Sequence, residues 1–296
     1  MAELYISVIL VFRVVQAVFS KRASNEVKNL RMMLSYIAFA KAISAVLGLL
    51  LIIVAANGFK ADLKTVVIAA FSGFMLFASS FCSVYAMKSG TISLSSMFST
   101  AGMIIPVIAG AVLFDKPVGV IQLAGLGLFF VSAWLLIGSS REIYKGFSIK
   151  TLMLLIGSLV ANGGTMLAQQ MFTAYVPQGD VSVFSFLSFA IISLLSAVAY
   201  KAGWLKTGEA GEGKLSKKLI VCAVALAVAV FVINQLATIS TTLVSPVILF
   251  TFINGGGTII STVVAAIMYK ERISAKSAAG IALGIMSLVI IKLFEV

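Results

Sequence analysis

GMIIPVIAGAVLFDK, residues 102–116, aligns without a gap on GTIISTVVAAIMYKE, residues 257–271. The match continues at the same offset of 155 residues as far as Leu136 and Ile291. Both stretches are hydrophobic, and both carry a short charged break at the same place. A membrane protein made of two copies of one unit is most often a transporter, because two repeats that rock around a shared site give alternating access.

The composition places the chain in a membrane. Apolar residues make up 61% of it and charged residues only 11%, and the mean hydropathy is +1.13. No soluble domain of this length can hide so much apolar surface, so lipid must solvate it. The apolar runs are continuous rather than alternating, which excludes an outer-membrane barrel.

Ten apolar runs of roughly 17–25 residues are each long enough to cross a hydrocarbon core of about 30 Å. Five precede the loop near 141–150 and five follow it, which predicts two repeats, 1–143 and 144–296. An odd number of spans per repeat gives the halves opposite orientations. The predicted fold class is an all-α integral membrane protein with ten transmembrane helices in a 5+5 inverted repeat. The expected spans are 4–20, 32–56, 65–87, 91–114, 118–139, 151–173, 181–204, 219–239, 243–268 and 274–294.

The basic residues predict the orientation. Sixteen Lys and Arg lie in the odd-numbered connections, and only Lys60, Lys64, Lys116 and Lys292 lie on the other side. The positive-inside rule then puts the odd-numbered connections in the cytoplasm and both termini outside. We expect a multi-pass protein of the cell (cytoplasmic or inner) membrane, whose net charge of +12 reflects this orientation rather than binding to nucleic acid.

The sequence lacks residues that several kinds of chemistry require. The chain has no His, and its two cysteines, Cys82 and Cys222, lie in separate apolar runs, so we expect no metal site and no cofactor. No GxxxxGK[ST] segment is present, which argues against ATP-driven pumping. Paired catalytic groups and GxSxG are also missing from the spans, so an enzyme is not expected.

Two basic residues lie deep inside predicted spans. Arg13 and Lys41 each lie about ten residues into a helix, or about 15 Å at 1.5 Å per residue. All ten acidic residues fall at span ends or in loops, so neither cation has an intramembrane carboxylate to pair with. A buried charge usually faces a cavity or a partner, and the missing counter-charge could come from an anionic or zwitterionic substrate. Alternatively, both side chains snorkel or bond to backbone carbonyls, and Lys41 could also carry a coupled proton.

Glycines interrupt the fourth and ninth spans at equivalent positions of the repeat. Gly102 and Pro106 lie mid-span in the first half, and Gly255, Gly256 and Gly257 in the second. Broken helices at matching places are a pointer to a midplane binding site, although tight packing by small residues uses the same composition.

Polar side chains also gather in mid-span, where they could line a site or act as interhelical hydrogen-bonding groups. Tyr85 could stack on substrate or belong to an interfacial belt. Together with Arg13 and Lys41, the candidate substrate-binding residues are Gln16, Ser83, Tyr85, Ser99, Asn162, Thr165, Gln169, Asn234, Gln235 and Asn254. The fifth and tenth spans, rich in Gly and aliphatic residues, are predicted to be packing helices.

The two halves resemble the drug/metabolite transporter superfamily, in particular its EamA-type branch. The resemblance is carried by residues 85–138, YAMKSG to WLLIG, by residues 240–291, STTLVSP to SLVII, and by VVQAVFSKRA at 14–23. It implies alternating access around a central cavity lined by spans one, three, four, six, eight and nine. Members commonly have cytoplasmic termini, whereas the charges here favour external termini, and we keep the charge-based prediction.

The sequence thus predicts a secondary transporter, an exporter or exchanger of a small polar metabolite such as an amino acid or organic acid. The expected partners are the substrate, the lipid bilayer, and a proton or counter-substrate. A single chain contains both halves, which is compatible with a functional monomer. Two alternatives stay open: an exchanger of sugar phosphates or nucleotide sugars, and a non-transporting membrane scaffold.

Overall fold

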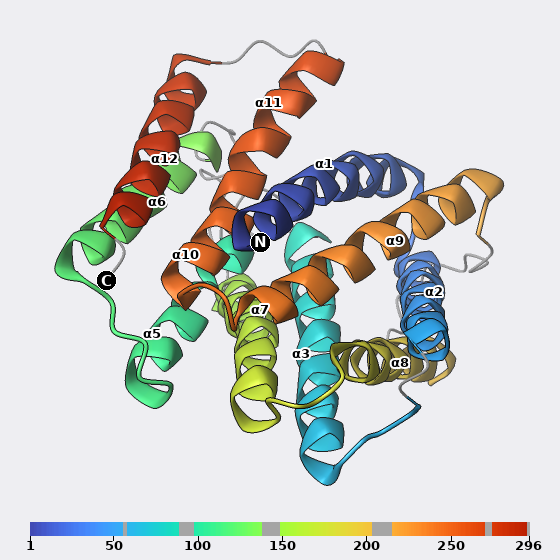
Figure 1. Ribbon diagram of the computed structural model, residues 1–296. Coiled ribbons are helices and arrows are strands. Elements are labelled where there is room, and N and C mark those ends of the chain that lie inside the picture. The colour runs from blue at the N-terminus through green and yellow to red at the C-terminus, as the bar shows by residue number, and fades with distance from the viewer. Residues whose placement is uncertain (56–57, 89–97, 138–148, 203–214, 270–273, 295–296) are drawn as a thin grey trace.

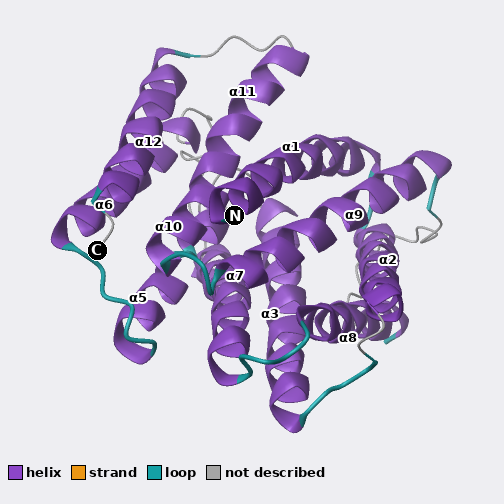
Figure 2. Ribbon diagram, viewed as in Figure 1, coloured by secondary structure: helices purple, strands orange, loops and turns teal. Residues whose placement is uncertain are grey.

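The computed structural model describes residues 1–55, 58–88, 98–137, 149–202, 215–269 and 274–294. Its regular elements are helical throughout this part of the chain (Figures 1 and 2). They are α1 (Ala2–Glu26), α2 (Leu30–Ala55), α3 (Leu63–Lys88), α5 (Ile104–Leu113), α6 (Val120–Ile137), α7 (Ile149–Tyr175), α8 (Val181–Lys201), α9 (Lys217–Ser240), α10 (Pro246–Thr251), the π-helix η2 (Phe252–Gly256), α11 (Gly257–Tyr269) and α12 (Ala275–Leu293). The expected repeat boundary at 143/144 lies outside the described residues.

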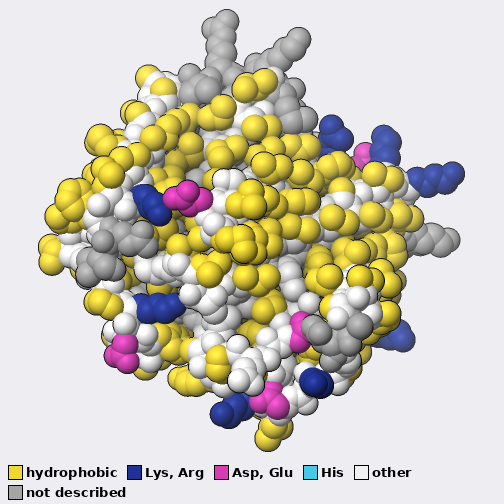
Figure 3. All heavy atoms as spheres, viewed as in Figure 1, with side chains coloured by type: hydrophobic (Ala, Val, Ile, Leu, Met, Phe, Trp, Pro, Cys, Tyr) yellow, Lys and Arg dark blue, Asp and Glu magenta, His cyan; other side chains and the backbone are white. Residues whose placement is uncertain are grey.

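Eight of the described helices are long and apolar enough to cross a membrane, and two shorter apolar helices, Phe98–Leu113 and Val120–Leu135, lie where the fourth and fifth spans are predicted. Large apolar side chains point outward along them; Val112 is 72% exposed and Leu194 is 64% exposed. Figure 3 shows hydrophobic side chains over most of the face in view, with few charges among them. Such a surface requires lipid, and the prediction of a multi-pass α-helical membrane protein is confirmed.

Polar side chains mark the first turns of several helices. Asp62 accepts a hydrogen bond from the Thr65 amide at 2.8 Å before α3, and Asp180 caps α8 through the Ser182 amide at 2.7 Å. Ser216 caps α9 in the same way. These side chains satisfy amides that have no partner within their own helix, and they fix where each span begins.

The main helix contacts join the first half of the chain to the second. α2 packs on α8, α3 on α7, α6 on α12 and α1 on α9. In Figure 1, α6 and α12 lie side by side at one edge, and α2 lies beside α8 at the opposite edge. Since the long helices of each half find their principal partners in the other half, the two halves cannot bury their inner faces separately.

The packing of α6 on α12 depends on small residues. The Ser132 hydroxyl donates to the Gly280 carbonyl at 2.6 Å, and Gly125 lies against Ser287 and Ile291. These contacts are reciprocal under the 155-residue offset, because Gly125 aligns with Gly280 and Ser132 with Ser287. Small residues let two helix backbones approach closely in a membrane, so the fifth and tenth spans pack against each other as the sequence suggests.

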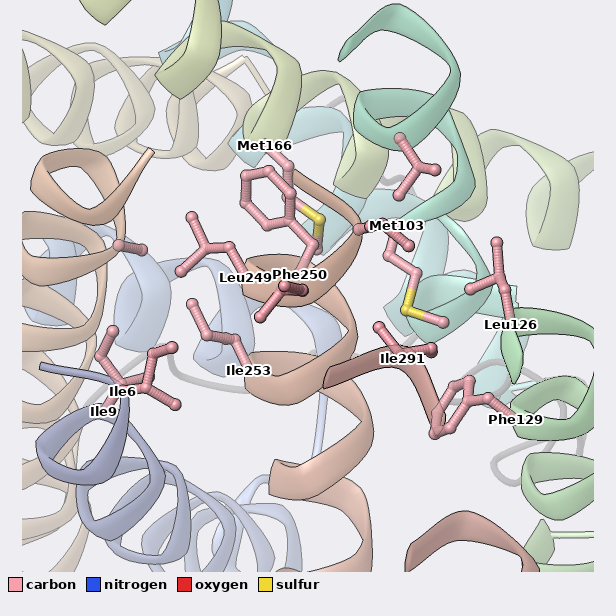
Figure 4. Close-up of a cluster of buried hydrophobic side chains, with 14 of the residues drawn as sticks. Ile6, Ile9, Met103, Leu126, Phe129, Met166, Leu249, Phe250, Ile253 and Ile291 are labelled. Atoms are coloured by element: carbon pink, nitrogen blue, oxygen red, sulfur yellow. The ribbon is translucent and has the colours of Figure 1, made fainter. Parts of the chain in front are cut away.

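A large apolar cluster surrounds the broken ninth span. Figure 4 shows Phe250 beside Met166 of α7, and Ile253 on the side of Ile6 and Ile9 of α1. Phe250 and Ile253 are each 1% exposed, and the cluster continues through Met103 and Phe129. The cluster therefore holds α10 and η2 in place from several sides at once.

Both predicted helix breaks are irregular in the structure. Gly102 and Met103 form a turn between two helical segments, and Phe252–Gly256 form a turn of π-helix. A Cβ built on Gly102 would lie 2.5 Å from the Leu159 carbonyl oxygen and 2.8 Å from the Gly163 nitrogen. The first break is therefore a place where the fourth span contacts the backbone of α7 directly.

We expect Gly102→Ala to destabilise the protein by about 1–3 kcal/mol, because the added methyl group has to displace backbone rather than a flexible side chain. Gly127→Ala is the matched control, because a Cβ at Gly127 has no atom within 4 Å and alanine favours helix by about 1 kcal/mol. Thermal unfolding in detergent measures both variants. Equal melting temperatures for the two would contradict this packing.

Candidate functional site

A polar cavity of about 190 Å³ lies among α1, α2, α3, α7, α9, α10 and η2. Its polar lining residues are Arg13, Gln16, Lys41, Ser79, Ser80, Asn162, Thr165, Gln169, Asn234 and Asn254, and its apolar lining residues are Leu76, Met166, Val230, Ile233, Ala237, Phe250 and Ile253. The cavity lining therefore combines two cations with amides and hydroxyls, and no carboxylate of the described residues lies among them.

The Arg13 guanidinium is held by two neutral amides. Nη1 donates to Gln16 Oε1 at 3.0 Å, and Nη2 donates to Asn254 Oδ1 at 3.2 Å. Nε is buried and has no hydrogen-bond partner in the described part of the chain. A guanidinium carries five N–H donors, so this charge is oriented by its neighbours but not neutralised by them.

Lys41 lies in the same cavity in a different environment. Its ammonium nitrogen is 5.3 Å from the centroid of the Phe189 ring, within the range of a cation–π contact. Among the described residues, no carboxylate pairs with it. The ring stabilises the charge and leaves the N–H donors available to an acceptor in the cavity.

Amide side chains connect the second-half helices around the cavity. Gln169 Nε2 donates to Asn234 Oδ1 at 3.0 Å, joining α7 to α9. One turn further along, the hydroxyls of Thr173 and Thr241 are 2.7 Å apart. On the α7 side, Asn162 donates to the Ser99 carbonyl at 2.7 Å. These bonds fix several amides at the cavity wall and satisfy part of their hydrogen-bonding capacity.

The connection between α5 and α6 reinforces the contact between α7 and α9. Lys116 Nζ donates to the Thr241 carbonyl at 2.7 Å, where a cation suits the carboxyl end of α9. Partial burial lowers the pKa of Lys116. Asp115 beside it has a φ of 49°, the left-handed conformation that directs the chain back so that the Lys116 amide reaches the Gly110 carbonyl at 2.9 Å.

Eight of the twelve candidate substrate-binding residues line this one cavity; they are Arg13, Gln16, Lys41, Asn162, Thr165, Gln169, Asn234 and Asn254. Ser99 is not among the lining residues, and its carbonyl accepts a hydrogen bond from Asn162 of α7. The side chains of Ser83 and Tyr85 lie outside the described residues. Gln235 points elsewhere: it lines a second cavity, and its amide bonds Ser182 at 3.0 Å and Ser185 at 2.8 Å.

The second cavity, of about 720 Å³, opens between the α2–α3 and α7–α8 connections. Its lining includes Lys60, Asp62, Gln178 and Asp180. Hydrogen bonds from Thr65 lower the pKa of the exposed Asp62 carboxyl, with a small contribution from the charge of Lys64. This cavity is a mixed-charge vestibule at the side of the protein with few basic residues.

Sequence reasoning missed two hydroxyls of the cavity lining. Ser79 and Ser80 line the cavity, one turn before Ser83; their only signal is a pair of small polar residues within an apolar run. The described part of the fourth span contributes no lining residue, because Gly102 lets that span pack behind α7 against Leu159 and Gly163. The second span, α2, contributes Lys41 to the lining.

Comparison with known proteins identifies a similar fold but indicates no function. No family model matches the chain, and no curated protein matches it. A solved structure named only "Crystal structure of protein" superposes with a TM-score of 0.79, covering 99% of this chain and 97% of that one at 15% identity. At this identity the likeness concerns the fold alone.

We expect Gln169→Leu to lower the melting temperature, because it leaves Asn234 Oδ1 without its partner. The double variant Gln169→Leu/Asn234→Leu should recover part of the loss, since removing both partners costs less than removing one. Interhelical hydrogen bonds in membranes contribute about 0.6–2 kcal/mol, which sets the expected coupling. A double-mutant cycle in detergent measures it, and additive effects would contradict the bond.

Proposed function

We propose that the chain is a secondary transporter, rather than an enzyme, of a small metabolite that carries a carboxylate. The observation that supports this most directly is the cavity in which Arg13 and Lys41 lie without a carboxylate among the described lining residues. Arg13 would bind one or both carboxylate oxygens through its fork of N–H donors. Lys41 would supply the second positive contact.

The rest of the lining supports a zwitterion or anion with an apolar body. Asn162, Gln169 and Asn234 would orient polar groups, while Met166 and Phe250 offer an apolar wall. A volume of about 190 Å³ is below the 300–1,000 Å³ typical of drug-sized ligands. Amino acids and organic acids of similar size fit this description better than nucleotide sugars, and two cations are fewer than a sugar-phosphate site would require.

We further propose that the ten apolar helices form a 5+5 inverted repeat that works by alternating access. The helix contacts are reciprocal under the repeat: α3 packs on α7 as α9 packs on α1, and α3 packs on α8 as α9 packs on α2. Two such halves, related by an axis in the membrane plane, can rock around a fixed midplane site. This arrangement supports the resemblance to drug/metabolite transporters, with export or exchange driven by a proton or counter-substrate.

We expect carboxylate-bearing ligands to stabilise the purified protein in a thermal-shift screen of amino acids, organic acids, sugar phosphates, nucleotide sugars and quaternary cations. L-leucine, its 2-oxo acid 4-methyl-2-oxopentanoate and leucinol form a matched set, because leucinol has no carboxylate. Arg13→Ala should weaken binding of the carboxylates about 10- to 100-fold, since hydrogen bonds to charged groups contribute about 1.5–3 kcal/mol. Lys41→Ala should weaken it as well.

Lys64→Ala is the control for this experiment, because Lys64 carries the same charge on the exposed start of α3. Uptake of the best ligand into proteoliposomes then tests transport. Stabilisation by quaternary cations alone, unchanged in the Arg13 and Lys41 variants, would overturn the carboxylate site. Binding without flux would instead favour a membrane scaffold or receptor.

The basic connections lead us to propose a cytoplasmic or inner membrane location with external termini. In a chain with Cys82→Ala and Cys222→Ala, we expect a membrane-impermeant maleimide to label Ala2→Cys in intact cells. It should label Lys217→Cys, at the start of α9 on the basic side, only after permeabilisation. The reverse pattern would show cytoplasmic termini.

A further inference from the structure

Asn254 joins the candidate site to the broken ninth span. Its Oδ1 accepts from Arg13 at 3.2 Å, and its Nδ2 donates to the Phe250 carbonyl at 2.9 Å. Its own carbonyl accepts from the Thr258 hydroxyl at 2.7 Å. One residue, 9% exposed, therefore contacts the cation of the cavity and both ends of the π-helical turn.

The turn around Asn254 is stabilised from outside rather than by regular helix bonding. Phe252–Gly256 follow π-helical geometry, which is rare, occurs mostly as single turns inside α-helices, and is frequently found at functional sites. Gly255 lies against the Phe129 ring, Gly256 against Leu10, and Gly257 against the aliphatic part of Arg13. The Arg13 side chain thus packs along the turn and donates a hydrogen bond to it, while belonging to α1 in the other half of the chain.

A carboxylate bound to Arg13 would compete directly with Asn254. Both side chains that now accept from the guanidinium are neutral amides, and a carboxylate is the stronger acceptor. The Nη2 bond to Asn254 is the longer of the two, and the adjacent Nε has no partner among the described residues. A carboxylate on Nε and Nη2 would use one of the two N–H donors of Nη2, and its negative charge would draw the guanidinium toward itself and weaken the bond from Nη2 to Asn254.

We propose that Asn254 is the positioning residue through which an anion at Arg13 controls the conformation of the broken ninth span. This inference rests on the carboxylate site proposed above. Without ligand, the hydrogen bond between Arg13 and Asn254 connects α1 to η2. With ligand, Arg13 pairs with the carboxylate, Asn254 is released, and α10 and η2 become free to rearrange. A ligand shifts a conformational equilibrium only through contacts that differ between the states, and this bond is such a contact.

Two isosteric substitutions make opposite predictions. Gln16→Glu places a carboxylate on α1 beside Arg13 and should draw the guanidinium away from Asn254, as a ligand would. Asn254→Asp places the same charge on the π-helical turn and should strengthen its bond to Arg13. Like Asn254→Leu, it loses the bond from Nδ2 to the Phe250 carbonyl, so the comparison of these two variants isolates the contact with Arg13. Asn254→Leu, which removes the acceptor without adding charge, should release the turn as Gln16→Glu does.

A cysteine at position 251 can report whether this segment becomes exposed. Thr251 lies in α10 directly before η2, it is fully buried, and its hydroxyl has no partner in the described part of the chain. In a Cys82→Ala/Cys222→Ala background, the rate at which a maleimide labels Thr251→Cys in detergent measures exposure of this segment. We expect 4-methyl-2-oxopentanoate to raise the rate about 5-fold or more in the parent chain.

Without any ligand, Gln16→Glu and Asn254→Leu should raise the labelling rate, and Asn254→Asp should be labelled more slowly than Asn254→Leu. Addition of the anion should not change the rate of Asn254→Asp. Monodisperse elution on size exclusion checks that each variant is folded. Equal rates in all variants, or labelling of Asn254→Asp as fast as that of Asn254→Leu, would overturn the coupling even if the parent binds carboxylates through Arg13. Absence of any binding or flux in the parent would overturn the proposed function, whereas the ligand-free comparison would still decide the coupling.

Discussion

A positive charge near the middle of a membrane needs acceptors, and this requirement organises the centre of the molecule. Arg13 on α1 finds one acceptor on its own helix, Gln16, and another on the π-helical turn of the second half, Asn254. Burying a charge in hydrocarbon without partners is costly, so these bonds constrain where α1 and η2 can lie. The wall that results is polar, positively charged and free of carboxylates among its lining residues.

The helices that carry these residues are held in place by contacts between the two halves of the chain. α1 packs on α9, α2 on α8, α3 on α7 and α6 on α12, and the cavity is lined by helices from both halves of the chain. The α6–α12 pair lies apart from the cavity lining and is joined by small residues and by the Ser132–Gly280 bond. Around the cavity, hydrogen bonds between side chains, such as Gln169 to Asn234, add to the apolar contacts, and such bonds can exchange partners more easily than an apolar interface can repack.

Part of the site was predictable from the sequence, for a clear reason. Arg13 and Lys41 stand out because any charge deep in an apolar span is unusual, and the mid-span amides stand out for the same reason. The glycine-rich breaks were found because the repeat places them at equivalent positions. Gln235 shows the limit: it is adjacent to Asn234, but a rotation of about 100° per residue turns it toward another cavity, and only Asn234 lines the central one.

By itself, the sequence determined that the chain is a helical membrane protein, where most of its long apolar helices lie, and which two of them carry cations in their interior. Only the tertiary structure decided which faces meet. The physical reason is that lipid is as apolar as a protein core, so an apolar helix does not reveal its inward face by its hydrophobic pattern. The partners of Arg13 and Lys41 therefore depended on packing between helices that lie far apart in the sequence, with Asn254 241 residues from Arg13.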